Sequence, residues 1–272
     1  MAADTNNLYA SMTHRTAMVL GSAAMERLAA ARVIVVGVGG VGSWCAEALV
    51  RSGLVHLALV DSDIICPTNL NRQLQATSRN LGESKVREIR ERLLSINPAA
   101  DIVAHHRVFD ETTADDFDLA AFDYVIDAID SIANKALLIE RCVAAGVTVF
   151  CSMGAAAKTD PTRVRVAPLS KTHGDPLARV VRRRLRARGV GLDGSCVFSD
   201  EPAADPAIET ICGTGGCECV HDRDAWNEST GEEAADWCAM KKRVNGALVH
   251  VTGVFGFTLA SMVIRDIMRR AE

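Results

Sequence analysis

Short runs of β-branched and aliphatic residues alternate with longer amphipathic segments over the first half of the chain. The short runs predict strands, at residues 32–36, 56–61, 102–104, 124–127 and 147–150. The segments between them predict helices, one ending at Gly53, one over 82–97 and one over 137–146. Buried strands separated by helices are typical of βαβ crossovers. Residues 30–152 are therefore expected to form an α/β core with a mostly parallel sheet covered on both faces.

The pattern changes after Pro161. Residues 163–166 alternate like a half-exposed strand, and Asp175-Pro176 opens a strongly basic helix. Residues 199–237 hold eleven acidic residues and one basic residue, which predicts a loop insertion. The uncharged stretch 246–264 contains a histidine and small polar residues, so we interpret it as a buried helix or a subunit interface, not a membrane span. We expect residues 1–272 to form one domain whose C-terminal extension has a basic helix, an acidic loop and an apolar helix.

Charge and cysteine content limit the kinds of nucleic-acid binding and the cellular compartment that we expect. The 272 residues include 30 Lys and Arg against 34 Asp and Glu, a net charge of -4. That balance excludes a nucleic-acid binder that works by bulk positive charge, but it leaves room for a local basic patch. Nine cysteines, with no secretory signal pattern in residues 1–32, predict a reducing intracellular compartment and a cytoplasmic protein.

A glycine-rich turn follows the first predicted strand. Its sequence is Gly37-Val-Gly39-Gly40-Val-Gly42, and a helix is expected directly after it. Glycines let the backbone turn tightly and approach a phosphate, while the helix N-terminus offers N–H groups to the anion. Asp61 ends the next strand, where a carboxylate can accept hydrogen bonds from ribose hydroxyls. Taken alone, the pattern is a dinucleotide-binding fingerprint and predicts an NAD enzyme, and a glycine turn without a ligand is the alternative.

The residues after Asp61 favour ATP over NAD. A polar run without apolar periodicity follows, and it includes Asp63, Asn69, Asn71, Arg72 and Gln73. Lys85 then lies in the first turn of the next predicted helix. A triphosphate that is cleaved to AMP needs cationic groups, which Arg72 and Lys85 can supply. The alternatives are a solvated arginine, an exposed helix lysine and asparagines that serve only as turn residues.

Two carboxylates close the fourth predicted strand, as Asp127-Ala-Ile-Asp130. Ligands of open α/β sheets lie outside the carboxyl ends of the strands, so a carboxylate there can face the phosphates and hold Mg²⁺. We expect Asp130 to bind Mg²⁺ and Asp127 to belong to the nucleotide site. A helix N-cap at Asp130 is the alternative.

In this order, these residues resemble the adenylating enzymes of the ubiquitin-activating superfamily, the ThiF, MoeB and HesA group. The matching segments are 37–42, Asp61-x-Asp63, 69–73, Lys85 and 127–130. Further segments, at 171–177 and 196–199, are most similar to the members of the group that dehydrate threonylcarbamoyladenosine in tRNA. The resemblance covers about residues 15–199 and resumes near 254–257.

This resemblance implies a homodimeric, Rossmann-like adenylation fold. ATP and Mg²⁺ would be lined by Gly40, Asp61, Asn71, Arg72, Lys85 and Asp130, and Arg15 would reach the phosphates in the partner subunit's site. In the implied reaction, a carboxylate of the modified tRNA attacks the α-phosphate of ATP, and the acyl-adenylate then closes on itself with release of AMP. The family also implies a cysteine desulfurase or sulfur acceptor as a partner class. The cysteine segment that bacterial members carry before the last helix is replaced here by Val244-Asn-Gly-Ala.

The basic helix is the candidate tRNA surface. Six arginines lie within ten residues, between 179 and 188. Such a helix suits salt-dependent contacts with phosphates that ignore base sequence. The candidate contacts are Arg179, Arg182, Arg183 and Arg186, and a solvated face paired with the acidic loop is the alternative.

Four cysteines in or after the acidic loop could bind Zn²⁺ as thiolates, namely Cys212, Cys217, Cys219 and Cys238. Free thiols are the preferred interpretation, because paired Cys-x-x-Cys motifs are absent. Their absence also weighs against a rival function, adenylation of the C-terminus of a ubiquitin-like sulfur-carrier protein. A second rival, a non-catalytic NAD-binding scaffold, would not require Arg72 and Lys85.

Overall fold

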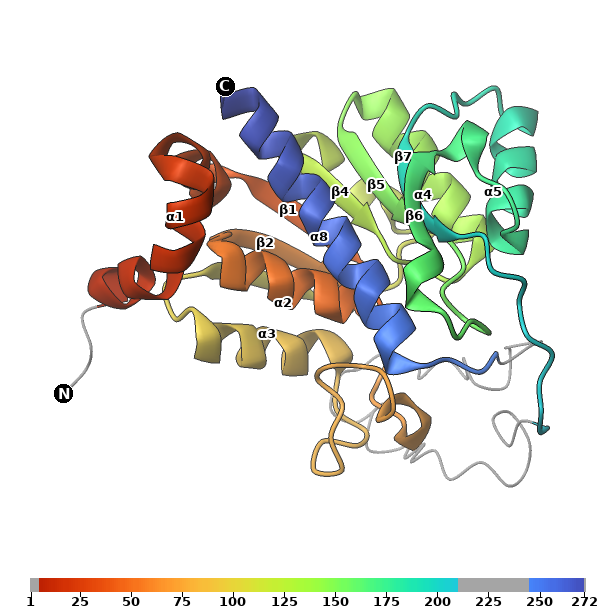
Figure 1. Cartoon of the computed structure of the whole chain (residues 1–272), viewed down its shortest axis with the longest axis horizontal. Helices are drawn as coiled ribbons and strands as arrows, with labels where there is room; N and C mark the ends of the chain where they lie inside the picture. The colour runs from red at the N-terminus through yellow and green to blue at the C-terminus, as the bar shows by residue number, and fades with distance from the viewer. Residues whose placement is uncertain (1–4, 210–244, 272) are drawn as a thin grey trace.

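The computed structural model describes residues 5–209 and 245–271, and a seven-stranded sheet runs through its centre (Figure 1). The strands are β1 (Arg32–Val36), β2 (His56–Val60), β3 (Asp101–His105), β4 (Tyr124–Asp127), β5 (Thr148–Ser152), β6 (Val164–Pro168) and β7 (Ser195–Ser199). They lie in the order β3-β2-β1-β4-β5-β7-β6. Every neighbouring pair is parallel except β6 and β7, so the expected mostly parallel α/β fold is confirmed.

The helices connect and flank these strands. They are α1 (Thr5–Ala30), α2 (Gly42–Ser52), α3 (Lys85–Ile96), α4 (Ile132–Ala145), α5 (Pro176–Ala187) and α8 (Val249–Ala271). Short 3₁₀ turns are η1 (Pro67–Asn69), η2 (Ala114–Asp116), η3 (Leu119–Ala121), η4 (Pro161–Arg163) and η5 (Leu169–Lys171). The basic helix and the apolar C-terminal helix both form where the sequence predicts them. Residues 201–209 contain no helix or strand, and the rest of the predicted insertion lies outside the described residues.

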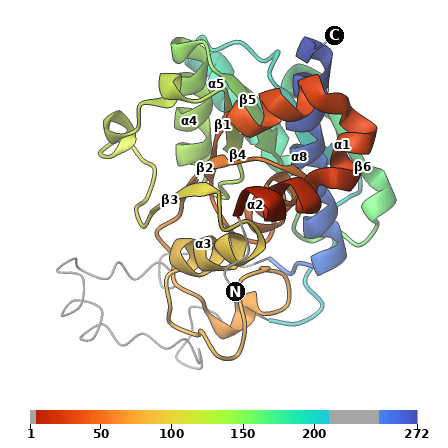
Figure 2. The ribbon, with the colours of Figure 1, turned by 90° about the vertical axis from the view of Figure 1, so that its left-hand side faces the viewer.

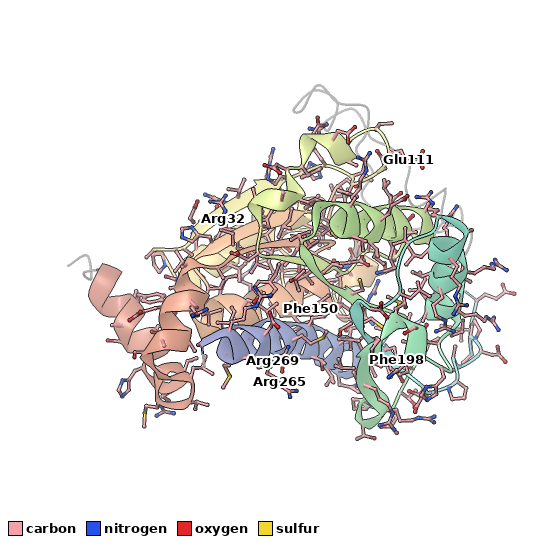
Figure 3. The ribbon with its side chains drawn as sticks, turned by 90° about the horizontal axis from the view of Figure 1, so that it is seen from above. Arg32, Glu111, Phe150, Phe198, Arg265 and Arg269 are labelled. Atoms are coloured by element: carbon pink, nitrogen blue, oxygen red, sulfur yellow. The ribbon has the colours of Figure 1, made fainter. Side chains whose placement is uncertain are left out.

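Alternate residues of each strand point to opposite faces of the sheet, because side chains in a strand have a period of two. Val33 and Val35 belong to one core with α1, α2, α3 and α8. Ile34 and Val36 belong to the other core with α4 and α5. Seen from above, α8 and α4 lie on opposite sides of the sheet (Figure 3). A sheet covered on both faces explains why its strands read as continuous hydrophobic runs.

Two elements did not follow from the hydrophobic pattern. β7 is a short strand that inserts between β5 and the edge strand β6. α1 has a kink at Gly21, where φ is +77°, and it packs over the end of α2. There the hydroxyl of Tyr9 donates to the carbonyl of Gly53 at 2.7 Å. Figure 1 shows α2 and α3 side by side, and Figure 2 shows the segment that follows β2 below α3.

Among the described residues, one helix, α8, is long and apolar enough to cross a membrane by length and composition alone. However, 56% of its most apolar 18-residue segment is buried inside the protein. Val251, Phe255 and Leu259 are fully buried, and a Cβ on Gly256 would lie 2.5 Å from the carbonyl oxygen of Val41. The expected buried helix is confirmed for this inner face.

Candidate nucleotide-binding site

The glycine turn lies at the topological switch point of the sheet, where the strand order reverses. β1 leads through α2 to β2 on one side, while β4 lies on the other side of β1. Gly37 has φ of +91°, and a Cβ there would lie 2.7 Å from the carbonyl oxygen of Ala128. A Cβ on Gly42 would lie only 1.8 Å from the carbonyl oxygen of Gly37. Both positions therefore require glycine, and the turn brings backbone N–H groups and the start of α2 to the carboxyl end of β1, where ligands of open α/β sheets bind.

Asp61 at the end of β2 holds this turn in place. Its Oδ2 accepts from the N–H of Val38 at 2.8 Å, and its Oδ1 accepts from the N–H of Asp63 at 2.9 Å. Burial raises the pKa of Asp61, while the positive charge of Lys85 opposes that rise. Each carboxylate oxygen has a second lone pair, so both can still accept from ribose hydroxyls.

Lys85 is a buried cation at the first position of α3. Its side chain lies 2.6 Å from Asp63 Oδ2, and the residue is 5% exposed. Burial alone would lower the pKa of Lys85, but the carboxylates of Asp61 and Asp63 raise it above its usual value. Lys85 therefore stays protonated. A cation at a helix N-terminus opposes the helix dipole, so these carboxylates are what holds it there.

Arg72 packs against the glycine turn. A Cβ on Gly40 would be 3.1 Å from Cγ of Arg72. The guanidinium donates to the carbonyl of Thr68 at 2.8 Å and to Oδ1 of Asn71 at 2.9 Å. Asn71 in turn donates to the carbonyl of Ala247, which joins this loop to the segment before α8. Arg72 thus contacts the glycine turn directly, whereas Lys85 is connected to it through Asp61, which accepts from Val38.

Asn69 and Gln73 are buried parts of the same loop. Oδ1 of Asn69 accepts from the N–H of Cys66 at 3.1 Å, so Asn69 caps the 3₁₀ turn η1. Gln73 lies beside the glycine turn, because a Cβ on Gly39 would be 3.8 Å from its Nε2. Its buried Oε1 has no hydrogen-bond partner among the described residues.

The expectation that Asp127 belongs to the nucleotide site needs correction. Asp127 is fully buried and pairs with Lys135, whose Nζ lies 2.7 Å from Oδ2. Lys135 also donates to the carbonyl of Ser152, and Oδ1 of Asp127 accepts from the N–H of Ile129. The ion pair therefore holds the turn after β4 from the protein interior, through the hydrogen bond between Asp127 and Ile129. Lys135 was missed because a lysine in an apolar helical stretch carries no sign of a buried partner eight residues earlier.

Asp130 is exposed just beyond this turn, and its charge contributes to raising the pKa of Lys85. The N-cap of α4 is Ser131, so the capping alternative for Asp130 does not hold. Within residues 5–209 and 245–271, no group of three or more His, Cys, Asp or Glu side chains could hold a metal ion by itself. A Mg²⁺ ion bound by one carboxylate and by phosphate oxygens does not need such a group.

Other candidate residues lie on elements away from the glycine turn. Arg15 is exposed on α1, which packs against α2 and α8. On α5, Arg179, Arg183 and Arg186 are exposed, whereas Arg182 is half-buried and donates to the carbonyl of Thr172 at 2.8 Å. The four candidate zinc ligands, Cys212, Cys217, Cys219 and Cys238, lie outside the described residues.

Known proteins with the same pattern identify the family. The sequence model of the ThiF family matches residues 13–272 of this chain. The chain belongs to the ThiF family. A relative from Bacillus subtilis, named tRNA threonylcarbamoyladenosine dehydratase, is 44% identical over 187 residues, which cover 69% of this chain and 74% of that protein. A relative of the same name from Escherichia coli is 36% identical over 269 residues, which cover 94% of this chain and 93% of that protein.

Solved structures with the same fold agree with this assignment. The E. coli dehydratase TcdA in complex with AMP superimposes with a TM-score of 0.80 at 32% identity and covers 96% of both chains. Its complex with ATP gives a TM-score of 0.79 with the same identity and coverage. E. coli MccB with ATP, at 19% identity and a TM-score of 0.60, covers 98% of this chain and 66% of its own and shares the fold alone.

Proposed function

We propose that this protein is an ATP-dependent enzyme that dehydrates threonylcarbamoyladenosine in tRNA through adenylation of its carboxylate. The observation that carries the proposal is the pair of cationic groups around the glycine turn, with Lys85 buried beside Asp61 and Asp63 and Arg72 against Gly40. An NAD site needs one acid for the ribose and little positive charge, whereas a triphosphate needs cations. The names and the ATP and AMP complexes of the dehydratase relatives support the same reaction.

The first step joins two anions. The substrate carboxylate attacks the α-phosphate of ATP, the bond from that phosphorus to the bridging oxygen breaks, and diphosphate leaves. Arg72, Lys85 and the N–H groups at the start of α2 offset the repulsion between carboxylate and phosphates and hold them for attack. Asp61 accepts from the ribose hydroxyls and so fixes the nucleotide relative to the turn.

The second step needs no nucleophile from the enzyme. AMP is a better leaving group than hydroxide, so a nucleophile within the same threonylcarbamoyl side chain displaces it and closes a ring. One carboxylate oxygen departs with AMP, and the net change in the nucleoside is the loss of one water molecule. The buried thiol of Cys196 fits this scheme, because burial raises its pKa to about 12 and keeps it protonated.

Asp130 is the residue that would hold Mg²⁺. An exposed carboxylate at the carboxyl end of β4 is the oxygen donor that this ion prefers, and Mg²⁺ is usually bound through one or two carboxylates together with substrate phosphates. The ion would supply positive charge to the phosphate oxygens. Asp130 therefore supports a Mg²⁺-dependent nucleotide site together with Arg72 and Lys85.

We further propose a cytoplasmic homodimer that binds tRNA through α5. Arg15 lies on α1 close in sequence to Met18 and Val19, which are 75% and 77% exposed. Exposed apolar side chains of this size beside an arginine fit a subunit contact through which Arg15 would reach the partner's phosphates. The exposed Arg179, Arg183 and Arg186 fit phosphate contacts with tRNA. A cysteine desulfurase or sulfur acceptor, and Zn²⁺ at the four cysteines, remain predictions from the sequence.

The decisive experiment combines purified protein, ATP, Mg²⁺ and tRNA that carries threonylcarbamoyladenosine. We expect release of AMP and diphosphate that depends on the modified tRNA, and a nucleoside lighter by one water in mass spectrometry. Arg72→Ala should abolish turnover, while Arg265→Ala on the exposed side of α8 serves as the matched control. An unchanged nucleoside mass, with ATP turnover on a ubiquitin-like carrier protein instead, would replace this proposal by the sulfur-carrier alternative.

A further inference from the structure

The backbone of Val38, between the first two glycines of the turn, is held at both of the peptide groups that it joins. Its N–H donates to Asp61 Oδ2 at 2.8 Å. Its carbonyl oxygen accepts from Nε2 of Gln75 at 2.9 Å. Gln75 is 3% exposed, so this contact is shielded from water. The orientation of the turn is therefore set by one group from the end of β2 and one from the loop that carries Arg72.

Further hydrogen bonds connect the glycine turn and the start of α2 to the loop that carries Arg72. The hydroxyl of Ser43 donates to the carbonyl of Gly39 at 2.7 Å and accepts from the N–H of Leu74 at 3.3 Å. In addition, Nε1 of Trp44 donates to the carbonyl of Arg72 at 3.0 Å. Residues 72–75 are thus hydrogen-bonded to the glycine turn and to the start of α2. A displacement of this loop would move Arg72 and the turn together.

Gln75 makes its contact in an unfavourable setting. Its buried Oε1 has no hydrogen-bond partner among the described residues. A buried polar atom without a partner destabilises the folded state, so an apolar side chain of the same size would remove that penalty while leaving the Val38 carbonyl unpaired. The net effect of such a replacement on folding is then small, because the two changes oppose each other. The replacement also removes the hydrogen bond that orients the Val38 carbonyl, and no gain compensates for that loss.

We propose that Gln75 is a positioning residue for the nucleotide, which holds the Val38–Gly39 peptide so that the turn keeps its N–H groups directed toward the phosphates beside Arg72. The proposal rests on the function proposed above. Gln75 itself touches the turn and not the phosphates, so its loss should weaken the binding of ATP and leave the tRNA contacts unaffected. It links the two parts of the site that come from β1 and from the loop after β2.

The test uses the full-length protein with Gln75→Met, which removes the donor at similar size, and Gln75→Glu, which replaces it by an acceptor. ATP affinity is measured by calorimetry with Mg²⁺ and without tRNA, and KM values for ATP and for modified tRNA are measured separately. For Gln75→Met we expect ATP affinity to fall about five- to tenfold, as for the loss of one hydrogen bond. KM for ATP should rise by a similar factor, while KM for tRNA and kcat at saturating ATP stay at the wild-type values. Gln75→Glu should lose at least as much affinity.

Asn97→Leu is the matched control. Asn97 is 1% exposed, its Nδ2 has no partner among the described residues, and it ends α3 far along the helix from Lys85. This variant should keep wild-type ATP affinity whatever its melting temperature, which separates a positioning effect from general destabilisation. Unchanged ATP affinity in folded Gln75→Met, or an equal rise of both KM values, overturns the positioning role and leaves the proposed function standing. A wild-type protein that binds no ATP overturns both.

Discussion

Removal of Lys135 should make the stability of this protein depend strongly on pH. In Lys135→Met the carboxyl of Asp127 loses the only cation beside it in the described part of the chain and remains fully buried. Burial already raises the pKa of Asp127, with Lys135 as the main opposing influence. The variant can avoid a bare buried charge only by folding with Asp127 protonated.

The size of the effect follows from the proton that Asp127 must take up. An aspartate in the unfolded chain has a pKa of about 3.9, so protonation at pH 7 costs about 4 kcal/mol, at roughly 1.4 kcal/mol per pH unit over about three units. That value lies within the range of about 3–5 kcal/mol for breaking a buried ion pair. Since the folded pKa is raised, the stability linked to this proton is complete below pH about 4 and is lost as the pH rises toward the folded pKa.

Urea denaturation of the wild type and of Lys135→Met at several pH values between 4.5 and 8 would measure this difference. We expect the deficit in the free energy of unfolding to be largest near pH 8 and to shrink by about 1.4 kcal/mol per unit as the pH falls. The double variant Asp127→Asn/Lys135→Met keeps an acceptor for the N–H of Ile129 and should recover to within about 1 kcal/mol of the wild type. A deficit that is the same at pH 5 and pH 8 would refute the reasoning.

Three other predictions concern the turn, the basic helix and the thiols. Gly42→Ala should destabilise the fold by at least about 3 kcal/mol, because its Cβ would lie 1.8 Å from a carbonyl oxygen, while Gly246→Ala, with nothing within 4 Å of its Cβ, should be nearly neutral in thermal unfolding. The triple variant Arg179→Ala/Arg183→Ala/Arg186→Ala should lower the slope of log affinity for tRNA against log salt by about 2–3, and an unchanged slope would show that α5 does not bind tRNA. Iodoacetamide at pH 8 should label half-buried Cys66 and spare Cys196 in the native protein, since burial raises the pKa of Cys196 to about 12; peptide mass spectrometry would detect early labelling of Cys196, which contradicts this.

Local patterns along the chain were enough to predict six of the seven strands of the sheet and the glycine turn. Continuous hydrophobic runs predicted strands that are buried on both faces of the sheet. The glycines at 37 and 42 indicated backbone positions where a Cβ has no room. Lys85 at the start of α3 was predicted from its residue type and its place after a turn signal. Such features depend on neighbours within a few residues, so they can be recognised without a structure.

The sequence by itself therefore determined the nucleotide turn, the residue types that surround it, and the order of strands and helices apart from α1 and β7. Only the tertiary structure decided that Asp127 is buried beneath the turn with Lys135, that Arg182 is tied to Thr172, and that Gln75 holds Val38. The partners in these contacts are 8, 10 and 37 residues apart. Whether a polar side chain faces a ligand or a buried partner depends on which segments meet at that point, and packing across the sheet decides that meeting.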